Sequence, residues 1–175
     1  MRRLLTLAFA GLAAVALSAP AAAVPPVQTT QTQQVSLVNP TACGTYGVRW
    51  NIDLTAEVTT FFDSEGRRRK VVANISEDNT VVNTVTGLTL RDGPVNFTQT
   101  TYFDPETQVR ELITVAGTSV NVRRGDELLI DTGYIEIDGQ TGEILFSAGP
   151  HPLRELLDGS FNIALALPGF CDILR

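Results

Sequence analysis

Two pairs of carboxylates are the residues of this sequence best suited to acid–base chemistry. Asp53 and Glu57 form the first pair, and Asp131 and Glu136 form the second. Paired carboxyl groups can donate and accept protons in a reaction when burial raises the pKa of one of them. Asp53 and Glu57 alternate with the apolar series that contains Trp50, so we predict that they face solvent. The sequence therefore predicts no catalytic residue here.

His151 is the single histidine, in the run Gly149-Pro150-His151-Pro152. An imidazole with a carboxylate behind it could act as a general base. We interpret His151 instead as a structural residue at the exit from a strand.

The basic run Arg67–Lys70 could contact an anion or a polysaccharide. We interpret it as a strand end whose charges discourage edge-to-edge association.

Other kinds of site lack the residues that they need. The formal net charge of −6 argues against nucleic-acid binding, which needs a clustered positive surface. One histidine and two cysteines leave little for a zinc site. The run 138–142 lacks the repeated acids of a calcium loop. The glycosylation triplets at Asn74 and Asn96 fall in predicted strands, and we discount them. We predict no metal and no cofactor.

The first 23 residues have the layout of a secretory signal peptide. Arg2 and Arg3 precede an apolar run from Leu4 to Leu17, and small residues follow up to Ala23. The run is shorter than a membrane span needs. We expect cleavage near Ala23, a secreted protein and no stable membrane span afterwards; a retained anchor is the alternative. The acidic mature chain is expected to be a soluble monomer.

Cys43 and Cys171 are the two cysteines of the chain. Disulfides persist outside the cell, and this pair lacks the close spacing of a redox-active motif. If paired, they tie the start of the folded domain to its end. Closing so long a loop contributes roughly 4 to 5 kcal/mol in the chain-entropy model.

The mature chain divides by composition into an arm and one domain. Residues 24–42 are rich in Gln, Thr and Pro and carry no charge, which predicts a flexible arm. Residues 43–175 are expected to form a single β domain. A long alternation from Tyr46 to Phe62 predicts a half-buried strand, and Asp63–Gly66 predicts the turn after it.

Similar strand-and-turn units continue almost to the end of the chain. We count about eight or nine short strands, the last from Phe161 to Leu167, and one short helix near Pro152–Leu157. Such a series predicts an all-β antiparallel meander that closes into a small β-barrel, with a β-sandwich as the alternative. Six aromatic residues could line its cavity or fill it as core: Trp50, Phe62, Phe97, Phe103, Tyr134 and Phe146.

Five segments of the sequence carry a likeness to known proteins. They are Cys43 with its strand, Ile130-Asp131-Thr132-Gly133-Tyr134-Ile135, Asp138 to Phe146, Ala148-Gly149-Pro150-His151-Pro152 and Phe170-Cys171-Asp172-Ile173-Leu174. Together these segments resemble a family of small secreted actinobacterial proteins of unknown function. Its members have a leader, an early cysteine before an alternating strand, and a last cysteine near the C-terminus. The resemblance implies an exported all-β domain and transfers no catalytic residue.

Three classes of function are compatible with these features. The leading hypothesis is a secreted, non-enzymatic β-barrel that binds a small apolar molecule or a component of the cell envelope. An enzyme of the small-barrel cyclase or isomerase type is the second, and it would need His151, Asp131 or Glu136 inside the barrel. A cell-envelope protein-interaction module that uses the outer strands and the arm is the third.

Overall fold

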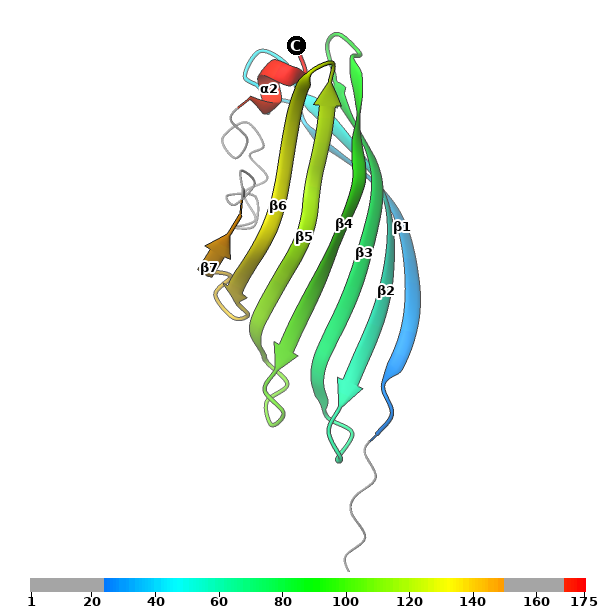
Figure 1. Cartoon of the computed structure of the whole chain (residues 1–175), viewed down its shortest axis with the longest axis vertical. Coiled ribbons are helices and arrows are strands. Elements are labelled where there is room, and N and C mark those ends of the chain that lie inside the picture. The colour runs from blue at the N-terminus through cyan, green and yellow to red at the C-terminus, as the bar shows by residue number, and fades with distance from the viewer. Residues whose placement is uncertain (1–23, 150–168) are drawn as a thin grey trace, which may run out of the picture.

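The computed structural model of the chain describes residues 24–149 and 169–175, which form one antiparallel sheet and one short helix (Figure 1). Each strand pairs with its neighbours in the sequence, so the sheet order is β1-β2-β3-β4-β5-β6-β7. This confirms the predicted all-β antiparallel meander. The elements are β1 (Val27–Asn39), β2 (Val48–Phe62), β3 (Arg68–Asn83), β4 (Thr89–Phe103), β5 (Arg110–Arg124), β6 (Glu127–Asp138), β7 (Ile144–Ala148) and α2 (Phe170–Ile173).

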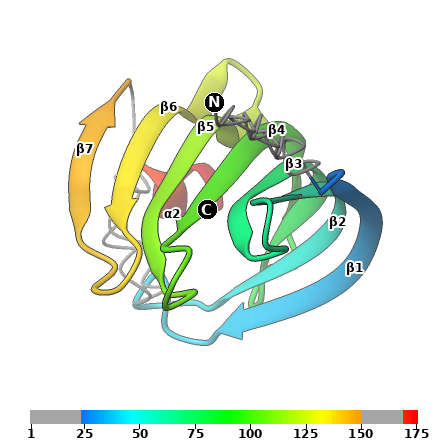
Figure 2. The same cartoon turned by 90° about the horizontal axis from the view of Figure 1, so that it is seen from below.

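The sheet curls strongly but stays open within the described residues. Viewed along the strands, it wraps around α2, with β1 and β7 as its two edges (Figure 2). The described part of the chain holds seven strands rather than eight or nine, and a closed barrel stays a prediction. The predicted helix near 152–157 and the predicted strand at 161–167 lie outside the described residues. Helix α2, which spans only four residues, was not predicted.

Three hairpin turns at one end of the sheet have the same pattern of hydrogen bonds. Each begins with an aspartate whose carboxylate accepts backbone N–H groups of the turn. Asp63 accepts from Glu65 and Arg67, and the equivalent bonds of the other two turns begin at Asp104 and Asp138. These hydrogen bonds lower the pKa of each aspartate. An Asp-initiated turn of this kind connects long strands without a helix, as the sequence predicted.

The structure corrects the interpretation of residues 24–42 as a flexible arm. Residues Val27–Asn39 form β1, which pairs with β2 in a continuous register from Val27 opposite Thr60 to Asn39 opposite Val48. Composition misled because Gln and Thr bury little surface, whereas strand pairing needs only the backbone. Threonine, being β-branched, also favours extended chain.

The core lies at the opposite end of the sheet from these three turns, around α2. Phe170 and Leu174 are fully buried and pack with Trp50 and the segment that follows β1. Cys43 and Cys171 are disulfide-bonded, which confirms the predicted pairing. Because a four-residue helix cannot be stable alone, the disulfide and this packing must hold it in place.

Three side chains also donate hydrogen bonds to backbone carbonyl groups of the C-terminal segment. They come from the loop before β2, from the end of β3 and from the end of β5. The Tyr46 hydroxyl donates to the Cys171 carbonyl, Asn83 Nδ2 donates to the Leu174 carbonyl at 3.0 Å, and Arg124 Nη1 donates to the Ile173 carbonyl at 3.0 Å. These are groups that a helix end leaves without partners. The C-terminus is therefore anchored inside the curl.

Candidate functional site

The inner face of the sheet is the face that carries Trp50, because Trp50 contacts α2 within the curl. Strand alternation and the register place Leu54, Ile75 and Phe97 on this same face. These three side chains are half-buried, unlike the fully buried core residues around α2. The inner face is thus apolar well beyond the part that α2 fills.

A polar cluster interrupts this apolar face next to the core. It consists of Glu77 and Asn79 from β3 and Asp92 from β4. Asn79 Nδ2 lies 2.7 Å from Glu77 Oε2 and 3.4 Å from Asp92 Oδ2, so one amide joins the two carboxyl groups. The backbone N–H of Asn121 donates to Asp92 Oδ1 at 2.7 Å. Asp92 is fully buried and Asn79 is 1% exposed.

A β-bulge positions the cluster. In the register, Asn79 lies opposite Asp92 and Glu77 lies opposite Val95, so β4 holds one more residue here than β3. The extra residue falls at Gly93-Pro94, and it lets Asp92 and Val95 both face inward although they are three positions apart. Bulges of this kind re-aim side chains next to functional sites.

Burial dominates the electrostatics of the two carboxyl groups. Desolvation raises the pKa of Asp92, and the nearby Glu77 raises it further, against the hydrogen bonds from Asn121 and Asn79 and the neighbouring Trp50 N–H, which lower it. Desolvation also raises the pKa of Glu77, while the bond from Asn79 lowers it. A carboxyl group with a raised pKa can hold a proton and so act as an acid or as a hydrogen-bond donor.

Two buried polar atoms beside the carboxyl groups lack a hydrogen-bond partner among the described residues: Trp50 Nε1 and Asn79 Oδ1. The Trp50 N–H still lies near enough to Asp92 to lower the pKa of that carboxyl. Buried polar groups without partners are rare, because each costs about 1 to 3 kcal/mol in lost hydration. The cluster therefore has unused hydrogen-bonding capacity.

The carboxylates singled out from the sequence lie elsewhere. Asp131 is buried on the inner face and accepts a hydrogen bond from the Ser119 hydroxyl. Glu136 is on the outer face, where it accepts a hydrogen bond from the Tyr134 hydroxyl at 2.6 Å. Asp53 and Glu57 are exposed on the face opposite Trp50, as predicted. His151 lies outside the described residues.

The six aromatic residues do not share one face of the sheet. Tyr134 and Phe146 contact each other on the outer face, with ring centroids 6.1 Å apart. Trp50 belongs to the core, and Phe103 is buried beneath the Arg68 guanidinium. Phe97 is half-buried on the inner face, and Phe62 is half-buried at the end of β2. A ligand contact for any of the six stays a prediction.

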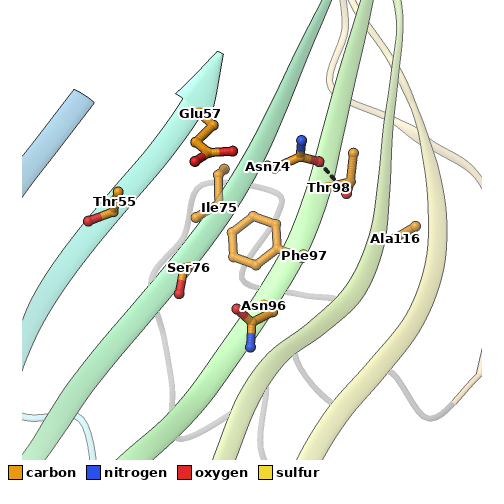
Figure 3. A pocket seen from close by; sticks show the side chains of 9 residues that line it. All are labelled: Thr55, Glu57, Asn74, Ile75, Ser76, Asn96, Phe97, Thr98 and Ala116. Atoms are coloured by element: carbon orange, nitrogen blue, oxygen red, sulfur yellow. Dashed lines mark hydrogen bonds between the residues drawn. The ribbon is translucent and has the colours of Figure 1, made fainter. Parts of the chain in front are cut away.

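The outer face carries an open depression of about 310 Å³ (Figure 3). Short polar side chains dominate its lining, and two of them satisfy each other, because the Thr98 hydroxyl donates to Asn74 Oδ1 at 2.9 Å. The lining side chains of the outer face are those of Thr55, Glu57, Asn74, Ser76, Asn96, Thr98 and Ala116. Ile75 and Phe97 also border the depression, although alternation directs their side chains to the inner face. We interpret this surface as a solvated face of the sheet.

Two side chains of the basic run Arg67–Lys70 contact residues close to them in the sequence. Arg67 forms ion pairs with Asp63 and Glu65 in the adjoining turn, and Lys70 lies over the Phe61 ring. These contacts support the interpretation of the run as a charged strand end.

Among residues 24–149 and 169–175, no three His, Cys, Asp or Glu side chains gather closely enough to hold a metal ion. No helix in that part of the chain has the length and apolarity to cross a membrane.

Glu77 and Asp92 are the functional candidates that sequence reasoning missed. The available signal was a polar break in an alternating apolar row, since Glu77 and Asn79 stand between Ile75 and Val81. Asp92 carried no such signal, because the bulge that turns it inward is visible only in the paired strands. Comparison with protein-family models, curated proteins and solved structures gives no match for this chain.

Proposed function

We propose that this chain is an exported β domain that binds a small, largely apolar molecule against the inner face of its curled sheet. The observation that carries the proposal is the half-burial of Leu54, Ile75 and Phe97 on that face. Apolar side chains that face inward yet keep part of their surface exposed gain free energy by covering it, about 25 cal/mol for each Å².

The curl and the disulfide support the same proposal. A curled sheet presents a concave surface, and small barrels of about eight strands hold one small ligand. Closure of the sheet into such a barrel is part of the proposal. The bond between Cys43 and Cys171 is compatible with an extracellular location. Export itself rests on the predicted leader.

An acid–base enzyme of the isomerase or cyclase type is the second candidate function. The specific observation in its favour is the pair of inward-facing carboxyl groups of Glu77 and Asp92, joined by Asn79. Carboxyl groups held in an apolar site with raised pKa values are suited to proton transfer.

Binding of the apolar dye Nile red to the mature protein tests the leading proposal. Two neighbouring residues of β4 provide matched variants, because Phe97 faces inward and Thr98 faces outward. Phe97→Ser should weaken dye binding by about tenfold or more, since it removes a large apolar contact. Thr98→Ser should leave dye binding unchanged.

The inner-face site would be refuted if both variants lost the same dye affinity, or if neither substitution changed it. Circular dichroism and the intact disulfide confirm that each variant is folded. Native mass spectrometry of the protein from its own host's culture fluid then shows whether it carries a ligand that denaturation releases.

A further inference from the structure

We propose that the cluster of Glu77, Asn79 and Asp92 binds a protonated primary amine, and that the ligand is therefore an apolar molecule with an ammonium group at one end. This inference rests on the proposed binding function, because the apolar body of such a molecule would lie on the inner face. It adds the chemistry of the head group.

The cluster has more hydrogen-bond acceptors than donors. The two carboxyl groups share one amide nitrogen, Asn79 Nδ2, and within residues 24–149 and 169–175 only the backbone N–H of Asn121 donates to Asp92 Oδ1. Asn79 Oδ1 is a further acceptor, buried and without a partner in the described chain. A primary ammonium group has three N–H donors and no acceptor, so it fits Glu77, Asp92 and this amide oxygen together.

The charges of the cluster also call for a cation. Arg91, the neighbour of Asp92 in β4, points to the outer face, where its Nε lies 2.9 Å from Asp78 Oδ1. Among the described residues, none of the main influences on the pKa of Glu77 or of Asp92 is a positive charge. A buried carboxylate without a counter-ion is costly, and an ammonium ligand would offset that cost.

The approach to the cluster is apolar. Asp92 is fully buried, whereas Glu77 is half-buried and therefore the member that a ligand meets first. Glu77 lies directly opposite Leu54 on β2. Ile75 and Phe97 form the next pair on the inner face. An alkyl or aryl chain that covers these three apolar residues would bring its head group to Glu77.

Trp50 makes the site observable. It is the one tryptophan of the chain, and its indole N–H lies beside Asp92. Indole fluorescence responds to nearby charge, so an ammonium group in the cluster should change the Trp50 emission. The reporter is intrinsic and needs no label.

The experiment compares octylamine with 1-octanol, octanoate and octyltrimethylammonium as ligands of the mature, disulfide-bonded protein at pH 7. Trp50 fluorescence and calorimetry measure binding. We expect octylamine to bind about tenfold or more tightly than octanol, because charge-assisted hydrogen bonds are stronger than those of a neutral hydroxyl group. Octyltrimethylammonium, a cation without N–H donors, should bind more weakly than octylamine. Octanoate should bind weakest.

Glu77→Gln and Asp78→Asn form the matched pair of variants. Both remove one negative charge from adjacent residues of β3, but Glu77 faces inward and Asp78 pairs with Arg91 outside. Glu77→Gln should abolish the preference for octylamine and leave octanol affinity within about twofold of the wild type. Asp78→Asn should keep the preference.

Three other outcomes would overturn the inference. Equal binding of octylamine and octanol removes the head-group site but leaves the proposed apolar function standing. Loss of the preference in both variants means a general attraction of cations to an acidic protein. Failure of all four ligands to bind contradicts the proposed function as well.

Discussion

The indole ring of Trp50 stacks on the phenyl ring of Phe170, with ring centroids 5.8 Å apart and 19° between the ring planes. This contact joins the longest alternating segment of the sequence to a helix of four residues near the C-terminus. The same indole presents its N–H toward Asp92. Trp50 therefore lies between the packed end of the curl and the polar cluster.

Replacing Phe170 by alanine should destabilise the protein by about 3 to 5 kcal/mol. Phe170 is fully buried, and its loss leaves a cavity against Trp50 that the disulfide-bonded helix cannot collapse to fill. Urea unfolding followed by Trp50 fluorescence measures the change. Val85→Ala is the control, because Val85 is 73% exposed and should change stability by less than about 0.5 kcal/mol. Equal stability of both variants would show that α2 does not contribute to the core.

Removing the disulfide with Cys43→Ser and Cys171→Ser together should cost roughly 4 to 5 kcal/mol. The bond constrains 128 residues of the unfolded chain and holds a helix too short to persist alone. Denaturant midpoints of the double variant and of the oxidised wild type give the difference. The chemically reduced wild type should match the double variant. A reduced protein as stable as the oxidised one would contradict this prediction.

Glu77→Gln should make the protein more stable than the wild type at pH 7. Burial raises the pKa of Glu77 above its ordinary value of 4.5, so the folded state binds more protons than the unfolded state in the range above that value. The contribution of Glu77 to wild-type stability therefore falls as the pH rises from about 4.5 through the raised pKa, and the neutral glutamine removes this loss.

The advantage of Glu77→Gln should shrink as the pH falls toward about 4, where Glu77 is protonated in both states. Thermal unfolding across this range, with Asp78→Asn as the exposed control, measures it. Asp63, Asp104 and Asp138, whose pKa values are lowered, act in the opposite direction, but equally in every variant. An advantage that grows on acidification would contradict the burial of Glu77.

Amide hydrogens in residues 27–39 should exchange slowly with solvent, at the positions that bond to β2. The register between β1 and β2 runs without a bulge over all 13 residues of β1. An edge strand pairs on one side only, so about half of its amides should be protected. Hydrogen exchange followed by mass spectrometry measures this, with the amide of Ser64 in the exposed turn after β2 as the unprotected reference. Complete exchange within seconds would contradict this prediction and support the interpretation of these residues as a flexible arm.

Local chemistry explains what the sequence predicted well. Alternation from Val48 to Phe62 sets one strand, and the Asp-initiated turns at Asp63, Asp104 and Asp138 set the hairpins, because both signals act within a few residues. The pairing of Cys43 with Cys171 followed from there being two cysteines. These features required no knowledge of distant contacts.

The tertiary structure decided the rest. Asp92 faces inward only because a bulge at Gly93-Pro94 adds one residue to β4, and a bulge is a property of two paired strands. Residues 27–39 became a strand because β2 offered its edge, although their own composition favours disorder. Phe170 and Leu174, which lie more than 100 residues after Trp50 in the sequence, are buried in the same core cluster as Trp50. A cluster such as Glu77, Asn79 and Asp92 arises from strand pairing, which the order of residues along one strand does not reveal.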